Sequence, residues 1–222
     1  MKEFRITEDG SHTLYLPELN ETYHSSHGAV SESMHVFINA GLKAKFQNND
    51  SLNILEVGFG TGLNAALTFF VAEKNNVKIN YFSLEPNPLS IDEVEKLNYN
   101  SIYGGDEMKD LILKFHSAEN GVKTSISDNF LFCNNKEKIQ EISLESDFYD
   151  LVYYDAFSPS TQPEMWTMPV FEKIYSAMRK NALLVTYVAK GEVRRTLKSC
   201  GFAVEKLPGF AGKREMTRAV KY

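Results

Sequence analysis

Hydrophobic and polar positions follow two different periods in the first fifty residues. Between residues 4 and 16 apolar side chains alternate around an Asp9-Gly10 turn signal, which predicts a β-hairpin. Residues 29–46 carry apolar side chains at helical spacing, and a polar break over residues 47–51 follows them, so an amphipathic helix is expected there. Residues 1–50 are therefore predicted to form an N-terminal extension made of a hairpin and a helix.

Short apolar runs alternate with helical patterns over the rest of the chain. The expected strands are 52–57, 78–85, 129–133, 150–155 and 182–188, and the expected helices are 62–73, 91–98, a short one after Asn135, 169–179 and 192–200. Nearly continuous apolar runs, such as residues 151–154, indicate strands that are covered on both faces. We predict an α/β domain over residues 51–222 with a doubly wound, mostly parallel sheet.

The end of the chain follows another pattern. Strands are expected over 202–206 and 216–221, with a Pro208-Gly209 loop between them, so the sheet should finish in an antiparallel C-terminal hairpin. Residues 99–128 are polar and give no clear element.

Composition excludes several classes of protein. The 222 residues are 43% hydrophobic and 24% charged, and no apolar run reaches the roughly eighteen residues of a membrane span. No apolar signal segment begins the chain, so a cytoplasmic protein is expected. The two cysteines, Cys133 and Cys200, have neither a Cys-x-x-Cys spacing nor a histidine cluster nearby, which argues against a metal site.

Charge is segregated along the chain, although the net charge is −5. From residue 190 onward nine Lys or Arg stand against three Glu, so this end carries +6 and the remainder carries −11. A basic end can approach phosphate groups, and ordinary solvated charge on a helix and a strand is the alternative interpretation.

A glycine-rich segment directly follows the first predicted strand of the domain. At this edge of an α/β sheet glycines let the backbone approach a ligand, and helix N–H groups face it. The spacing Gly-x-Gly-x-Gly after an acidic residue resembles the loop of class I methyltransferases that use S-adenosylmethionine, and a structural turn is the alternative. The candidate cofactor-binding residues here are Glu56, Gly58, Phe59, Gly60, Thr61, Gly62 and Asn64.

Two further acidic residues end predicted strands. Glu85 ends the second strand, where an ionised carboxylate is suited to accept hydrogen bonds from ribose hydroxyls; a surface acid is the alternative. Asp155 ends the strand 150–155 and precedes Phe157 and Pro159. Its carboxylate is suited to orient a nucleophilic amine while Phe157 stacks on a planar base, or else it caps the next loop.

Aromatic and basic residues complete the candidate chemistry. Trp166, the only tryptophan, is either a stacking surface or an anchor for its loop. Basic side chains with Phe210 among them suit phosphate neutralisation and base stacking at the C-terminal end. These basic residues are Lys190, Arg194, Arg195, Lys198, Lys213, Arg214, Arg218 and Lys221.

Together these segments resemble the tRNA (5-methylaminomethyl-2-thiouridine) methyltransferases, which occur as half of a bifunctional enzyme or as stand-alone proteins. The matching segments are 23–33, 56–64, 85–89, 155–159, 163–167, 193–195, 201–202 and 209–216. The resemblance implies a class I, Rossmann-like methyltransferase fold with S-adenosyl-L-methionine as cofactor. It implies methyl transfer to the exocyclic amine of 5-aminomethyl-(2-thio)uridine at the tRNA wobble position.

The resemblance also implies roles for individual residues. Asp155 would be the catalytic residue, and Glu32 would line the cofactor pocket. The tRNA would lie against the basic C-terminal face, and its contacts would be Phe157, Pro159, Met165, Trp166, Arg194, Arg195, Phe210, Lys213 and Arg214.

Two departures from the family pattern change these expectations. The chain ends just after the strand 216–221, so the flavin-dependent oxidase domain is expected to be absent, and upstream wobble-uridine modification enzymes would supply the aminomethyl group. Where the family has an Asp after the third strand, this chain has Asn134-Asn135, and Asn135 is expected to accept a hydrogen bond from the adenine amino group.

Two other functions compete with this interpretation. One is a class I N-methyltransferase that acts on a small amine or a protein, with the basic end merely solvated. The other is a non-catalytic RNA-binding relative, against which the intact glycine loop, Glu85 and Asp155 argue.

Overall fold

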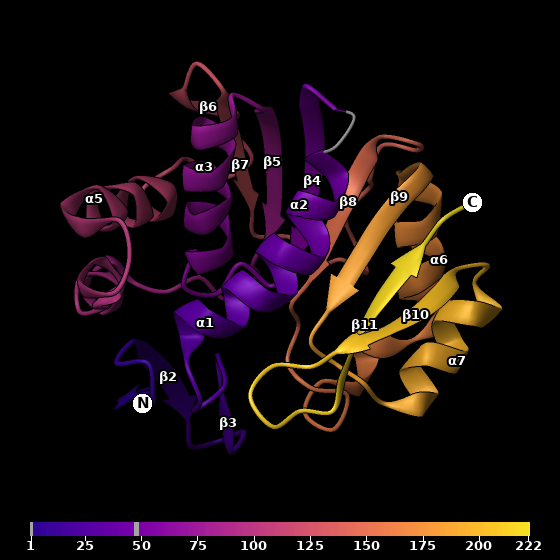
Figure 1. Ribbon diagram of the computed structural model, residues 1–222, viewed down its shortest axis with the longest axis horizontal. Coiled ribbons are helices and arrows are strands. Elements are labelled where there is room, and N and C mark those ends of the chain that lie inside the picture. Colours follow the sequence, from indigo (N-terminus) through magenta and orange to yellow (C-terminus); the bar gives the residue numbers. More distant parts are fainter. Residues whose placement is uncertain (1, 47–48) are drawn as a thin grey trace.

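The computed structural model describes residues 2–46 and 49–222 (Figure 1). The chain begins with a small antiparallel sheet of β1 (Glu3–Ile6), β2 (His12–Leu16) and β3 (Glu21–Thr22). The predicted hairpin is confirmed, because β1 pairs with β2 and Gly10 takes a left-handed φ of 83° in the turn. Asp9 ties this turn to the next helix by accepting a hydrogen bond from the Ser31 backbone N–H at 3.0 Å.

The helix predicted over residues 29–46 is confirmed as one continuous helical segment. It comprises α1 (Ala29–Ser33), the wider-turned η1 (Met34–Leu42) and α2 (Lys43–Phe46). Gly41 lets this helix approach the sheet closely, since a Cβ there would lie 3.0 Å from a methyl group of Val185. Of the polar break expected over 47–51, residues 47 and 48 lie outside the described residues.

An eight-stranded sheet forms the centre of the molecule, in the order β10-β11-β9-β8-β4-β5-β7-β6. Its strands are β4 (Ser51–Val57), β5 (Lys78–Leu84), β6 (Thr124–Ser127), β7 (Phe130–Asn135), β8 (Tyr149–Tyr154), β9 (Met178–Thr186), β10 (Ala203–Pro208) and β11 (Glu215–Val220). The five strands from β9 to β7 are parallel. The C-terminal hairpin β10–β11 adds an antiparallel edge, as the sequence predicted.

The helices between these strands largely follow the predicted pattern. They are α3 (Leu63–Asn75), α4 (Ile91–Val94), α6 (Met168–Ala177) and α7 (Gly191–Ser199). Residues 99–128, which gave no clear pattern, form η2 (Tyr99–Ser101), α5 (Gly105–His116) and strand β6. The prediction of a short helix after Asn135 was wrong, because residues 136–142 form a loop with turns.

Side chains of each central strand alternate between two hydrophobic clusters. In β8, Leu151 and Tyr153 belong to the cluster beneath α3, α5 and the helix 29–46. Val152 and Tyr154 belong to the opposite cluster, beneath α6 and α7. Both faces are therefore buried, which explains the continuous apolar run in this strand. The carboxyl ends of the parallel strands point to the lower side of Figure 1, where the N-terminal sheet and the β10–β11 loop also lie.

Candidate functional site

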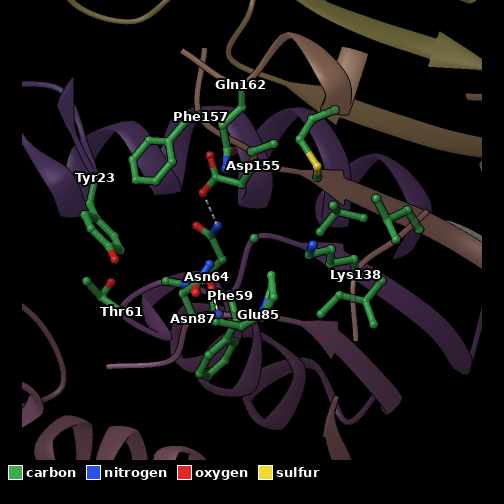
Figure 2. Close-up of a pocket in the computed structure, with 18 of the residues that line it drawn as sticks. Tyr23, Phe59, Thr61, Asn64, Glu85, Asn87, Lys138, Asp155, Phe157 and Gln162 are labelled. Atoms are coloured by element: carbon green, nitrogen blue, oxygen red, sulfur yellow. Dashed lines mark hydrogen bonds between the residues drawn. The ribbon is translucent and has the colours of Figure 1, made fainter. Parts of the chain in front are cut away.

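A cavity of about 620 Å³ opens at the carboxyl ends of β4, β5 and β8 (Figure 2). This volume is typical of small-molecule sites. Nine of the residues that sequence analysis selected line it: Gly58, Phe59, Gly60, Thr61, Asn64, Glu85, Asp155, Phe157 and Met165. The tertiary structure thus brings together segments that are about a hundred residues apart in the chain.

The glycine loop holds its backbone open at the start of α3. Gly58 has a φ of 92°, and a Cβ there would lie 2.5 Å from the carbonyl oxygen of Asp155. Gly60, with a φ of 53°, faces the ring of Tyr23, and Gly62 precedes the helix in a left-handed conformation. Side chains would close this cradle, so the loop suits a ligand that contacts the backbone and the helix N-terminus.

Glu85 fastens the glycine loop to the end of β5. Its Oε2 accepts a hydrogen bond from the Gly60 backbone N–H at 2.9 Å, and its Oε1 accepts one from the Asn87 N–H at 2.9 Å. Burial raises the pKa of Glu85, and these two hydrogen bonds partly offset that effect. Each oxygen keeps a further lone pair, so the carboxylate is suited to accept hydrogen bonds from two ligand hydroxyls.

Asn64 joins two carboxyl groups beside the loop. Its Nδ2 donates to Asp155 Oδ2 at 2.9 Å, drawn as a dashed line in Figure 2, and to Glu56 Oε1 at 3.0 Å. Glu56 is fully buried, and this burial raises its pKa well above the ordinary value. Glu56 is not among the residues that line the cavity, so its place is behind the loop, where it positions Asn64.

Asp155 is the carboxyl group of this cluster that faces the cavity. Burial raises its pKa to about 7, with a further increase from the negative charge of Glu32. The hydrogen bond from Asn64 and the positive charge of Lys213 act in the opposite direction. The cavity therefore contains an acid that changes its charge near neutral pH.

The N-terminal segment forms one wall of the cavity, which sequence analysis missed. Tyr23 packs edge-to-face against Phe157, with ring centroids 5.3 Å apart at 86° (Figure 2). Lys2, Leu16, Leu19 and His24 also line the cavity. The segment 23–33 had carried part of the family resemblance, but it had pointed only to Glu32. Glu32 is instead buried behind this wall, where it accepts a hydrogen bond from the Ser25 N–H at 2.8 Å.

The opposite wall is the loop that replaces the expected short helix. Residues 138–141 line the cavity, and the Lys173 ammonium of α6 donates to the carbonyl oxygens of Ile139 at 2.9 Å, Gln140 at 2.7 Å and Ile142 at 3.0 Å. Asn135, expected at the adenine, is absent from the cavity lining in the described part of the chain. Its Oδ1 accepts the Glu137 N–H at 2.7 Å, so the structure gives it a turn-forming role.

Trp166, in η3 (Pro163–Trp166), anchors its loop. It is 6% exposed, and its Nε1 donates to the Phe157 carbonyl at 2.8 Å. Of the two interpretations left open by the sequence, the structure favours the anchor. Met165 lines the cavity, whereas Trp166 does not. Gln162, which the sequence did not single out, lines it as well (Figure 2).

The basic C-terminal residues divide into internal and exposed groups. Arg194 is 8% exposed, and its guanidinium donates to Thr217 Oγ1, the Glu215 carboxylate and the Met216 carbonyl at 2.5–3.2 Å. The expectation that Arg194 contacts tRNA was therefore wrong, because its donors are used within the fold. Arg218 and Lys221 are likewise paired, with Glu205 and Asp147. Exposed members are Lys190, Arg195, Lys198, Lys213 and Arg214.

Other selected residues lie outside the cavity lining. Pro159 and Phe210 are partly buried, and Phe210 packs near His35 with centroids 6.1 Å apart. Within residues 2–46 and 49–222 no group of three His, Cys, Asp or Glu side chains is placed to hold a metal ion. In the same residues no helix has the length and apolar character needed to cross a membrane.

Comparison with known proteins bears on this site. Residues 107–222 match the family model described as S-adenosyl-L-methionine-dependent methyltransferase. The tRNA 5-methylaminomethyl-2-thiouridine biosynthesis bifunctional protein MnmC of Cupriavidus metallidurans is 31% identical over 96% of this chain and 33% of that protein. The protein of the same name from Burkholderia multivorans is 28% identical over 94% of this chain and 33% of its own length.

A solved structure agrees with the sequence relatives. The crystal structure of MNMC2 from Aquifex aeolicus matches 99% of this chain and 70% of its own, with a TM-score of 0.83 and 27% identity. The chain spans about a third of the length of the curated relatives it matches.

Proposed function

Since the chain belongs to the family of S-adenosyl-L-methionine-dependent methyltransferases, we propose that it methylates the exocyclic amine of 5-aminomethyl-(2-thio)uridine at the wobble position of tRNA. The names of the relatives, all concerned with 5-methylaminomethyl-2-thiouridine in tRNA, support this substrate. The bound cofactor supplies an electrophilic methyl group on a positively charged sulfur atom.

The residues around the cavity fit the cofactor. The open backbone at Gly58 and Gly60, with the N-terminus of α3, suits its carboxylate, and Glu85 suits the ribose hydroxyls. The apolar side chain of Ile139, in the opposite wall, suits the adenine ring. This assignment replaces the adenine contact that was expected of Asn135.

Asp155 carries the proposal for the reaction. Its carboxylate faces the same cavity as the glycine loop, and its pKa of about 7 lets it accept a proton from a substrate ammonium group near neutral pH. The amine must lose this proton, because only its free lone pair attacks a methyl group. Asn64 fixes the carboxylate by its hydrogen bond of 2.9 Å, so the amine is held in one orientation.

The substrate base would enter beside Phe157. Its ring and the side chain of Gln162 lie near Asp155 (Figure 2), and Met165 also lines the cavity. Exposed Lys190, Arg195, Lys198 and Arg214 would contact phosphates. In this proposal the N-terminal extension, residues 1–50, completes the cavity wall of the methyltransferase domain, residues 51–222. The enzyme would work in the cytoplasm after other wobble-uridine enzymes have made the aminomethyl group.

The test is a methylation assay on defined tRNA. The protein is incubated with methyl-labelled S-adenosylmethionine and tRNA that contains 5-aminomethyluridine, and the digested nucleosides are analysed by mass spectrometry. The expected product has one added methyl group on that nucleoside, and Asp155→Asn should reduce its formation by about a hundredfold or more. An unmodified nucleoside, with cofactor binding intact, would contradict the proposal and favour a small amine or a protein as substrate.

A further inference from the structure

An ion pair joins the β10–β11 loop to the first helix beside the cavity. Lys213 Nζ lies 2.7 Å from Glu32 Oε1, although the two residues are 181 positions apart in the chain. Glu32 is 6% exposed, and its second oxygen already accepts the Ser25 N–H. A carboxylate this deeply buried needs a positive partner, and among the described residues Lys213 is the cation paired with it.

The loop that carries Lys213 is a tight turn. Gly209 has no room for a Cβ, which would lie 2.2 Å from the Lys213 carbonyl oxygen, and Ala211 and Gly212 have φ values of 35° and 79°. Such a tight turn folds the chain back on itself. Figure 1 shows this loop at the lower side of the molecule, below the end of β9.

A second contact brings the same ammonium close to the catalytic segment. Lys213 Nζ lies 4.8 Å from the centre of the Tyr187 ring. The Tyr187 hydroxyl donates to the carbonyl oxygen of Ala156 at 3.1 Å, and Ala156 directly follows Asp155. Tyr187 also lines the cavity. Lys213 is therefore linked through Tyr187 to the backbone of Ala156, the residue next to Asp155.

Several ionisable groups face Asp155 from the elements around it. Glu32 comes from α1, Glu56 from β4 through Asn64, and Lys213 from the β10–β11 loop, while the hydroxyl groups of Tyr81 and Tyr187 are close enough to interact with its charge. Glu32 raises the pKa of Asp155 and Lys213 lowers it. Loss of either member of the ion pair therefore changes the charge that Asp155 experiences, in opposite directions.

We propose that Lys213 is a positioning residue of the methyl transfer: by pairing with Glu32 it shields Asp155 from a second carboxylate and holds the loop 209–214 at the edge of the cavity. This inference rests on the proposed function, because it gives Lys213 a task in the same site. It differs from the phosphate contact that the sequence resemblance implied for Lys213.

The test is a titration of Asp155 in the whole protein. Carbon-13 NMR of aspartate-labelled protein, with Asp155→Asn to identify the signal, gives the midpoint directly. Lys213→Met should raise this midpoint by about one pH unit, and Glu32→Gln should lower it. Lys213→Arg, which keeps the positive charge, should leave the midpoint of Asp155 at the wild-type value. Lys206→Met is the matched control, because it removes a positive charge from the same hairpin, where Lys206 pairs with Glu215 at 3.4 Å.

Activity provides the second readout. The pH at which the single-turnover rate is half-maximal should move with the NMR midpoint in each variant. Equal midpoints in wild type and in Lys213→Met, or an unchanged midpoint in Glu32→Gln, would overturn the inference even if the protein methylates tRNA. Moved midpoints in a protein that leaves tRNA unmethylated would instead overturn the proposed function, and the role of Lys213 in the transfer with it.

Discussion

The side-chain amide of Asn64 donates a hydrogen bond of 2.9 Å to Asp155, across 91 positions of the sequence. The same nitrogen donates to Glu56, which is completely buried. Asn64 is at the start of α3, directly after the glycine loop. The helix that faces the cofactor site therefore also fixes the carboxylate that we propose for proton transfer. The cofactor site and the proposed proton acceptor are thus positioned by the same helix.

This relationship predicts the effect of Asn64→Leu. Leucine has a similar volume but no donor, so both carboxyl groups lose their common partner, and the free energy of unfolding should fall by about 1–3 kcal/mol. Methyl transfer under saturating cofactor should slow by about tenfold or more, because Asp155 would no longer be held in one orientation. Single-turnover rates and chemical denaturation measure the two effects. Asn64→Gln, which keeps the donor on a longer side chain, should lose less stability than the leucine variant; equal losses would contradict this account.

The pKa of Asp155 predicts how stability depends on pH. A carboxyl group with a pKa of about 7 in the folded protein, against the ordinary 3.8, keeps its proton more tightly when folded. The stabilisation that this group adds to the free energy of unfolding is complete below pH 4. It is lost progressively as the pH rises toward 7, and it is fully lost above that. By pH 8 this loss amounts to about 4 kcal/mol at most. The neutral amide of Asp155→Asn recovers part of it, so this variant should be about 1–2 kcal/mol more stable than wild type at pH 8.

Thermal unfolding of both proteins at pH 4.5 and pH 8 checks this prediction. The melting temperature of Asp155→Asn should exceed that of wild type by about 3–5 °C at pH 8. The difference should be much smaller at pH 4.5, where the wild-type carboxyl group is protonated. An equal difference at both pH values would show that Asp155 titrates normally.

Lys173 predicts a change in cofactor affinity without a change in chemistry. Its ammonium binds three carbonyl oxygens of residues 139–142, so Lys173→Met should loosen the cavity wall that residues 138–141 form. The Kd for S-adenosylmethionine, measured by calorimetry, should rise by about tenfold, and the rate at saturating cofactor should change less than twofold. Lys136→Met is the control, because it alters an exposed lysine of the same loop that neither makes these bonds nor lines the cavity in the described structure. An unchanged Kd in Lys173→Met would contradict the role of this contact.

The exposed basic residues predict salt-dependent tRNA binding. Arg195→Glu combined with Arg214→Glu should weaken tRNA binding and make the slope of log K against log salt shallower by about one unit per lost phosphate contact. Binding of S-adenosylmethionine should be unchanged, because neither residue lines the cavity in the described structure. Arg195→Glu combined with Lys180→Glu is the comparison, because it changes the net charge equally and Lys180 is an exposed residue of β9. A slope equal to that of wild type would show that these arginines do not contact tRNA phosphates.

The local sequence determined most of the elements and the position of the cofactor site. Continuous apolar runs and helical patterns depend on neighbours a few positions apart, so the strands β4, β5, β8 and β9 and the helix 29–46 could be predicted. The glycine loop, Glu85 and Asp155 also follow strands directly. Because parallel strands end at one edge of the sheet, their proximity follows from the topology.

The tertiary structure decided which polar groups are free to act. Arg194 and Arg195 are adjacent and both basic in the sequence, yet Arg194 is buried against Glu215 and Arg195 is exposed. Burial and pairing depend on which distant strand a side chain meets, and no local pattern contains that information. The wall formed by Tyr23 and the pairing of Lys213 with Glu32 likewise depend on segments that come together only on folding. The sequence thus determined the fold and the edge of the sheet where chemistry occurs, and long-range packing decided which residues surround that site and with what charge.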